Sequence, residues 1–167
     1  MTTDQKGAIA ETAIAHAAVK LGIGVFKPIS DGERYDLIFD VGSALLRVQC
    51  KWAVRSGEVV VVRCYSCRRT RGGMTVRHYS AAEVDAVAAY CAETERCYLL
   101  APRLFARRRI VHLRLAPSLN NQQARINWAS EFEFEATLGA RRGAVAQLGE
   151  RRAGSAKATG SSPVGST

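Results

Sequence analysis

The segment RYDLIFDVGSALLRVQCK, residues 34–51, contains two apolar runs on either side of a glycine. This pattern predicts a β-hairpin that reverses at residues 41–43, where a turn-forming residue is needed. Side chains two apart on a strand point to one face, so Gln49 and Lys51 should project together. The start of one hairpin strand lies beside the end of the other, which brings Asp36 to the same place.

A carboxylate, an amide and an ammonium group gathered in this way suit the cleavage of a phosphodiester. A hard cation such as Mg²⁺ prefers oxygen ligands, which the Asp36 carboxylate and one or two neutral oxygens can supply. A lysine beside the cation can orient the attacking water or stabilise charge on a phosphate oxygen. The alternative is an ordinary cross-strand ion pair between Asp36 and Lys51, with Gln49 solvated on the strand.

The composition predicts one compact domain that binds a polyanion. The chain has 167 residues, is 47% hydrophobic and carries a net charge of +9, with arginine as the main cation. Arginine matches phosphate geometry, and excess positive charge is typical of nucleic-acid binding, although membranes and acidic proteins also attract it. The apolar stretches are too short to span a membrane and the N-terminus is polar, so a cytoplasmic location without a membrane partner is expected.

An N-terminal helix is predicted over residues 4–21, where alanine is abundant. Glu11 lies among small and apolar residues of this helix, so it should be at least half-buried and should need a partner. A metal or Lys51 would provide that partner. The alternative pairs Glu11 with His16 or Lys20 on an exposed stripe.

The residues after this helix predict a strand meander. Strands are expected over residues 23–28, 58–64 and 110–115, and a helix capped by Asn120 or Asn121 should extend to Phe132. Residues 80–83 have the spacing of a capping box, and helical propensity continues to Glu93, so a helix could begin there.

The segment from residue 68 to residue 79 is basic, has two glycines and no acids, and is predicted to be a loop. Such a loop beside the site could follow a phosphate backbone, and the alternative is a solvated loop whose arginines serve only solubility. The candidate DNA-contacting residues are Arg34, Arg63, Arg68, Arg69, Arg71, Arg77 and His78.

Five cysteines in a chain without a secretory signal are best interpreted as reduced thiols. Cys64 and Cys67 have the spacing of half a zinc site, but the sequence offers no second matching pair.

The glutamate-bearing helix, the RYDL segment at residues 34–37 and the RVQCK segment at residues 47–51 resemble the PD-(D/E)XK nuclease superfamily. The closer resemblance is to its branch of intron-encoded homing endonucleases and relatives of archaeal Holliday-junction resolvases. It extends from about Lys6 to about Phe134 and includes Asn120-Asn121-Gln122 and Ile126-Asn127-Trp128-Ala129. The superfamily pattern has an acidic residue two positions before Lys51, where this chain has Gln49; in this branch glutamine is expected.

This resemblance implies an α/β, restriction-endonuclease-like core over residues 1–142, with an N-terminal helix followed by a mixed β-sheet meander and flanking helices. It also implies strands over residues 86–91 and 96–101, after a single helical turn at residues 80–83. The implied activity is metal-dependent cleavage of double-stranded DNA, as in homing endonucleases. The alternatives are a resolvase-like nuclease selective for branched DNA, and a catalytically inactive DNA-binding protein of the same fold.

The site residues implied by the resemblance are Glu11, Asp36, Gln49 and Lys51, with Mg²⁺, or Mn²⁺ in its place, as the cofactor. Asp36, Gln49, Glu11 and the backbone carbonyl of Cys50 would be the metal ligands. Lys51 would orient the water and stabilise the phosphate. Cutting both strands of a duplex needs two sites, so a homodimer or homotetramer is expected.

Residues 143–167 are rich in glycine, alanine, serine and threonine and contain no aromatic residue, which predicts a disordered tail. One reading frame of a transfer-RNA D-arm encodes the VAQLG of residues 145–149, and a TΨC arm encodes the GSSP of residues 160–163. We therefore hypothesise that the reading frame runs through a transfer-RNA gene, and a cloverleaf in the nucleotide sequence would test this.

Overall fold

The structure is a computed structural model, and it describes residues 1–30, 32–117 and 125–139. The N-terminal helix α1 spans Thr3–Lys20, close to its predicted bounds. Its start is a capping box, in which the Gln5 backbone N–H donates to the Thr2 hydroxyl and the Thr2 N–H donates to the Gln5 side chain. The helix ends before Gly22, whose φ of 70° suits glycine.

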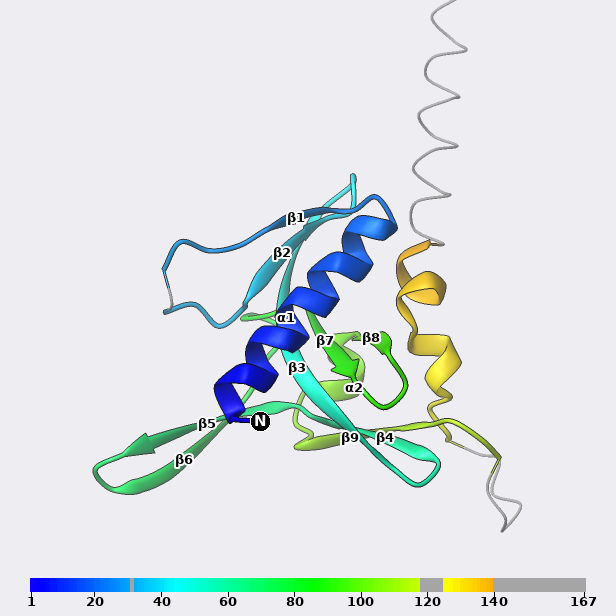
Figure 1. Cartoon of the computed structure of the whole chain (residues 1–167). Coiled ribbons are helices and arrows are strands. Elements are labelled where there is room, and N and C mark those ends of the chain that lie inside the picture. Colours follow the sequence, from blue (N-terminus) through cyan, green and yellow to red (C-terminus); the bar gives the residue numbers. More distant parts are fainter. Residues whose placement is uncertain (31, 118–124, 140–167) are drawn as a thin grey trace, which may run out of the picture.

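One mixed sheet of seven strands forms the centre of the molecule (Figure 1). Five strands follow each other in antiparallel order, and β7 and β8 branch from β3, with β7 parallel to β3. The strands are β1 (Gly24–Phe26), β2 (Leu37–Asp40), β3 (Leu45–Ser56), β4 (Val59–Arg63), β7 (Ala86–Cys91), β8 (Arg96–Leu100) and β9 (Ile110–Arg114). The predicted hairpin is β2 and β3, and its turn contains Gly42 with a φ of 81°.

Strand β3 is longer than the sequence predicted, and it pairs with three other strands. It continues beyond Lys51 to Ser56. Its first residues pair with β2, residues 48–53 pair with β7, and its last three pair with β4. Val48 pairs with both Leu37 of β2 and Ala86 of β7, so the site end of β3 has neighbours on both edges.

The alternation of side chains in β3 and β7 divides the core into two layers. Cys50 and Ala88 point to the face that α1 covers, where they pack with Ile14 of the helix. Ala53 and Ala89 belong to the opposite layer, together with residues of β4, β8 and β9. Figure 1 shows α1 lying across one face of the sheet. Gln49 and Lys51 therefore project away from the helix-covered layer.

The basic segment that was predicted to be a loop is a two-stranded hairpin, so that prediction was wrong. Strand β5 (Tyr65–Thr70) pairs with β6 (Gly73–His78), and Gly73 has a φ of 116° at the turn. Pairing gives the backbone groups of both strands hydrogen-bond partners, which an irregular loop would leave to water. This β5–β6 ribbon projects from the body of the molecule (Figure 1).

The chain between the ribbon and β7 makes the single turn that was expected, with the N–H groups of Glu83 and Val84 donating to the Ser80 carbonyl. Strands β7 and β8 confirm the hairpin implied by the resemblance. A short helix α2 (Pro102–Phe105), which the sequence analysis did not predict, buries Phe105. No helix within the described ranges is long and apolar enough to cross a membrane.

The helix predicted to extend to Phe132 is absent over residues 126–128. These residues run beside β9 of the sheet. The Arg114 N–H donates to the Asn127 carbonyl, and Arg114 and Trp128 form an isolated parallel β-bridge. Pairing with the sheet thus outweighs local helix propensity. A 3₁₀ helix, η1 (Ala129–Phe132), and a π-helical segment, η2 (Glu135–Gly139), follow. The caps at residues 120–121, the boundary at residue 142 and the tail lie outside the described residues and stay predictions.

Candidate active site

Asp36 stands directly before β2, and the backbone of β3 holds its carboxylate. The Cys50 N–H donates to Asp36 Oδ2 over 2.7 Å, and the Asp36 N–H donates to the Val48 carbonyl over 2.9 Å. Burial raises the pKa of the Asp36 carboxyl, and the negative charge of Glu11 adds to this, while the Cys50 hydrogen bond and Lys51 oppose it. The hairpin register therefore fixes a carboxylate where charge is costly, unless a cation joins it.

Gln49 adjoins Asp36, as the sequence predicted. Its amide nitrogen donates to Asp36 Oδ2 and lies 3.3 Å from the Cys50 carbonyl oxygen. Gln49 is the one buried polar residue within the described ranges, at 9% exposure. The amide presents its nitrogen to the carboxylate, so metal ligation by Gln49 requires its oxygen to turn to that position.

Lys51 projects from the same face of β3 as Gln49 and lies near Asp36, but the two charges do not form the ordinary ion pair that was the alternative. Within the described residues, no carboxylate oxygen lies within 4.0 Å of the ammonium. Its Nζ lies instead 4.9 Å from the ring centroid of Tyr79. Burial lowers the pKa of Lys51, and the negative charge of Asp36 opposes that shift. The ammonium can therefore serve another anion.

Glu11 is half-buried, and its partner is a residue that the sequence analysis did not single out. The Lys27 Nζ lies 2.9 Å from Glu11 Oε2, where a metal, Lys51, His16 or Lys20 had been considered. Lys27 directly follows β1 and precedes Pro28. The sequence could have pointed to Lys27 because it lies at the site end of the first predicted strand. Its contact with Glu11, however, depends on the docking of α1.

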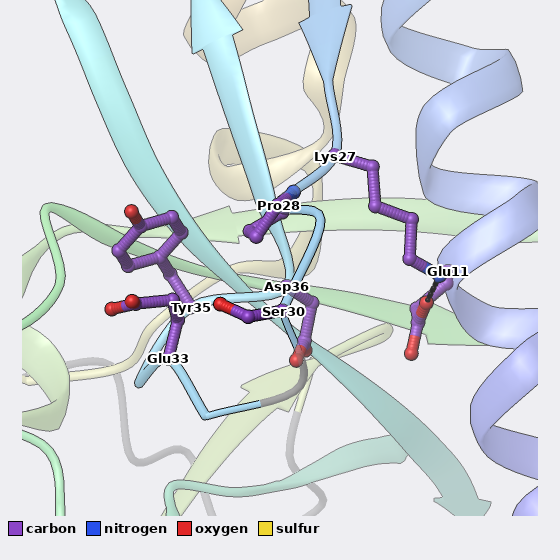
Figure 2. Close-up of a pocket in the computed structure, with 7 residues that line it drawn as sticks. All are labelled: Glu11, Lys27, Pro28, Ser30, Glu33, Tyr35 and Asp36. Atoms are coloured by element: carbon purple, nitrogen blue, oxygen red, sulfur yellow. Dashed lines mark hydrogen bonds and ion pairs between the residues drawn. The ribbon is translucent and has the colours of Figure 1, made fainter.

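Glu11 of α1 and Asp36 of the sheet region line the same pocket, which has a volume of about 120 Å³. Figure 2 shows Asp36 near the centre, with Glu11 approaching from α1 and bound to Lys27. Ser30 and Glu33 also line the pocket, and the sequence analysis did not single them out as site residues. The remaining lining residues are Pro28 and Tyr35.

The donor groups at this corner fit a hard divalent cation. Asp36 and Glu11 supply carboxylates, and Gln49 and the Cys50 carbonyl supply neutral oxygens next to Asp36. Nowhere in the described part of the chain do three or more histidine, cysteine or acidic side chains gather as a metal cluster. So few oxygen ligands would hold a divalent cation that keeps several of its waters, as Mg²⁺ does.

The half zinc site at Cys64 and Cys67 is not formed as a ligand pair. Cys64 is fully buried and its thiol donates to the Val62 carbonyl, whereas Cys67 is exposed on β5. Burial raises the pKa of the Cys64 thiol to about 11. A thiol in this environment stays protonated at neutral pH, whereas zinc binds the thiolate.

Arg34 was predicted to contact DNA, but its guanidinium is engaged within the protein. Its two terminal nitrogens donate to the Ser66 hydroxyl over 2.9 Å and to the His78 carbonyl over 3.0 Å. Its Nε lies 3.3 Å from Glu83, which also binds Arg77. Arg34 thus connects the segment before Asp36 to the base of the β5–β6 ribbon.

The other predicted DNA contacts lie on or near this ribbon. Arg71 and His78 are exposed on it, and Arg63 is exposed at the end of β4. Arg68 and Arg69 belong to β5, where they pair with Thr75 and Met74. The ribbon therefore presents Arg71 and His78 to solvent, and Arg34 joins its base to the segment before Asp36.

Comparisons of the sequence and the fold with known proteins both find endonucleases. A family model described as PD-(D/E)XK endonuclease matches residues 1–135. The solved structure of a bacterial homing endonuclease, I-Ssp6803I, is 29% identical in sequence, with a TM-score of 0.68. The match covers 88% of this chain and 99% of that one. A search of curated proteins finds no match.

Proposed function

The chain belongs to the PD-(D/E)XK endonuclease family, and from this we propose that it is a metal-dependent DNA endonuclease that cuts both strands of a duplex, as homing enzymes do. The observation that carries the proposal is the corner where β2 meets β3. There, Asp36 is held by the Cys50 N–H, and the Lys51 ammonium lies close to it without a carboxylate partner in the described residues.

The oxygens of Asp36, Glu11, Gln49 and the Cys50 carbonyl would hold the cation, Mg²⁺ or Mn²⁺. A cation bound there supplies Lewis acidity toward the phosphate and its attacking water. In this role Glu11 would turn from Lys27 toward the cation. The raised pKa of Asp36 supports this assignment, because a buried carboxylate gains from any neighbouring positive charge.

Lys51 acts on the substrate directly in this proposal. Hydrolysis forms a bond from water oxygen to phosphorus and breaks the bond from phosphorus to a sugar oxygen, while negative charge builds up on the phosphate. The ammonium donates hydrogen bonds to the phosphate oxygens as this charge develops, and it orients the water. Burial strengthens such an interaction, because the local dielectric is low.

The exposed basic residues of the β5–β6 ribbon would follow the phosphate backbone beside the cut. Such contacts provide affinity and orientation more than sequence choice. Because one corner cuts one strand, cleavage of a duplex needs a second copy of the chain, so we propose a homodimer or homotetramer.

Cleavage of supercoiled plasmid that carries the flanking genomic locus tests the function. With Mg²⁺ we expect discrete products, and we expect none after EDTA treatment or in Lys51→Ala. Lys20→Ala is the matched control, because Lys20 lies in the last turn of α1. Undiminished cutting by Lys51→Ala would contradict the assignment. A parallel four-way DNA substrate, cut in preference to the linear site, would instead favour a branched-DNA nuclease.

One observation favours a second candidate, a DNA-binding protein of this fold that does not cleave. The Gln49 amide presents its nitrogen to Asp36, which competes with a cation for that oxygen. Calorimetric titration with Mg²⁺ or Mn²⁺ separates the two candidates. An active site binds the cation in the native protein, and Gln49→Glu should bind it more tightly because a carboxylate is the stronger ligand. A native protein that retards DNA on a gel but binds no cation would be the inactive form.

A further inference from the structure

The ring of Tyr79 contacts two cations from different parts of the chain. The Lys51 Nζ is 4.9 Å from the ring centroid, and the Arg34 guanidinium carbon is 4.6 Å from it. Both distances are within the range in which a cation is attracted to the face of an aromatic ring. Lys51 therefore has a specific contact at its ammonium, although it has no ion pair with a described carboxylate.

The ring is held firmly in place. Tyr79 directly follows β6 and is only 3% exposed, packed in the core layer opposite α1. Its hydroxyl hydrogen-bonds with Ser66 of β5. Burial raises the pKa of Tyr79 to about 12, so the phenol stays neutral and does not draw the ammonium into an ion pair with its oxygen.

Arg34, the second cation near the ring, is itself held in place. Its guanidinium is bound by the Ser66 hydroxyl, the His78 carbonyl and Glu83, which together hold it at the base of the β5–β6 ribbon. A lysine side chain has four flexible carbons and loses much conformational freedom when it is ordered. A fixed ring beneath the ammonium restricts that freedom before any substrate arrives.

We propose that Tyr79 is a positioning residue, whose ring keeps the Lys51 ammonium in place for the phosphate and separate from the Asp36 carboxylate. This inference rests on the proposed function of Lys51. The contribution comes from the face of the ring and not from the hydroxyl. The physical prediction is that phenylalanine replaces Tyr79 well and that an aliphatic side chain of similar size does not.

The first test compares Tyr79→Leu with Tyr79→Phe in steady-state cleavage. We expect kcat to fall roughly tenfold or more in Tyr79→Leu, because small misplacements of a reacting group are costly, while KM and DNA affinity stay within about twofold. Tyr79→Phe should retain most of kcat. Tyr90→Leu is the matched control, because Tyr90 packs edge-on against Trp52 at 5.9 Å on the helix-covered side. Equal kcat values in Tyr79→Leu and the native enzyme would overturn the proposal.

A second test follows the placement itself and does not need activity. Protons over a ring face resonate upfield, so the Lys51 Hε signals, assigned by their loss in Lys51→Ala, should be shifted in the native protein and in Tyr79→Phe. The shift should vanish in Tyr79→Leu. Lys6 serves as the internal reference, because its Nζ lies 5.8 Å from the centroid of Trp52 and should not change. Unshifted Lys51 signals in the native protein would also overturn the proposal.

The two tests separate failure of this inference from failure of the proposed function. If Lys51→Ala cuts DNA normally, the assigned chemistry is wrong, whatever the spectra show. If Lys51→Ala is inactive but Tyr79→Leu retains native kcat and native Lys51 shifts, only the positioning role is wrong.

Discussion

The corner around Asp36 and the β5–β6 ribbon are both polar, but they use their polar groups in opposite ways. At the corner, the Gln49 amide and the Cys50 N–H both donate to the half-buried Asp36 carboxylate, and Gln49 and Cys50 are buried. On the ribbon, Arg71 and His78 are exposed. Bond cleavage needs groups held in a fixed geometry, whereas contact with a regular phosphate backbone needs accessible charge. Under the proposed function, the corner would therefore set the catalytic rate and the ribbon would set the affinity for DNA.

The strongest way to test this contrast is to change the half-buried Asp36 carboxylate. Asp36→Asn keeps the size and an acceptor for the Cys50 N–H but removes the charge, so we expect cleavage to slow by roughly a hundredfold or more. DNA retention on a gel should stay near that of the native protein. A parallel loss of binding and cleavage would show that the corner also carries affinity.

The same variant should be more stable than the native protein in metal-free buffer at neutral pH. Burial raises the pKa of Asp36 above its usual 3.8, so the folded protein holds this proton more strongly than the unfolded chain does. The native protein therefore loses stability as the pH rises from 3.8 through the raised value, and Asp36→Asn avoids that loss. Thermal unfolding at pH 7 with EDTA measures it. A lower Tm for Asp36→Asn would contradict the assigned cost of the buried charge.

A moderate effect is expected from the ion pair that joins β3 to the start of β7. Asp85 accepts hydrogen bonds from the Arg47 backbone N–H and from its Nε and Nη2, at 2.9 to 3.1 Å. Asp85→Asn should lower the free energy of unfolding by about 1–2 kcal/mol, because charge-assisted bonds are lost. Urea unfolding measures this cost. The control Glu58→Gln disrupts the exposed pair with Arg55 and should cost a few tenths of a kcal/mol at most.

The pH dependence of that cost is a further check. The hydrogen bond from Arg47 lowers the pKa of Asp85, so this contribution is complete above 3.8 and is lost as the pH falls through the lowered value. The native protein and Asp85→Asn should therefore approach equal stability in acid. A difference that stays constant down to strongly acidic pH would show that the Asp85 charge does not account for the stabilisation.

A smaller effect is expected on the ribbon. Arg71→Ala should weaken DNA binding a few-fold and reduce the salt slope of binding by about one, as loss of a single phosphate contact does. The turnover of bound DNA should not change. Titrations at several salt concentrations measure the slope, with the exposed Arg103→Ala in α2 as the matched control. A fall in kcat at unchanged affinity would reverse the roles assigned to ribbon and corner.

The smallest expected effect is a difference in thiol reactivity between a cysteine at the corner and a cysteine on the ribbon. Cys50 at the corner is buried, and burial raises the pKa of its thiol, whereas Cys67 on the ribbon is exposed. The other three cysteines are buried. A thiol reagent should therefore label one cysteine quickly in the folded protein and none in Cys67→Ser, which should cleave DNA normally. Fast labelling of Cys67→Ser would show that the corner opens to solvent.

The sequence predicted the corner well because its geometry is local. A hairpin places the start of one strand beside the end of the next, and period-two alternation places Gln49 and Lys51 on one face. The contact between Gln49 and Asp36 follows from these two rules alone. The same rules could not determine whether Lys51 would pair with Asp36, since both arrangements fit the register.

The contacts that the sequence did not predict depend on tertiary docking. Lys27 reaches Glu11 because α1 packs over the sheet, and Tyr79 reaches Lys51 from the end of the ribbon, whose base Arg34 contacts. The ribbon itself was predicted to be a loop because its glycines and arginines dominate the pattern. The ribbon also lacks the clear alternation of apolar and polar side chains that would predict a strand with one buried face. Even its apolar Met74 is 65% exposed.

The parallel pairing of β3 with β7 has a consequence for the order in which the chain is made. Arg47 and Asp85, which join the ends of these strands, are 38 residues apart in sequence. A ribosome-bound chain that stops before β7 already contains Asp36, Gln49 and Lys51, but the edge of β3 that β7 occupies has no partner strand. The edge of β3 next to the Asp36 corner therefore gains its second neighbouring strand only after the chain has been synthesised beyond residue 86.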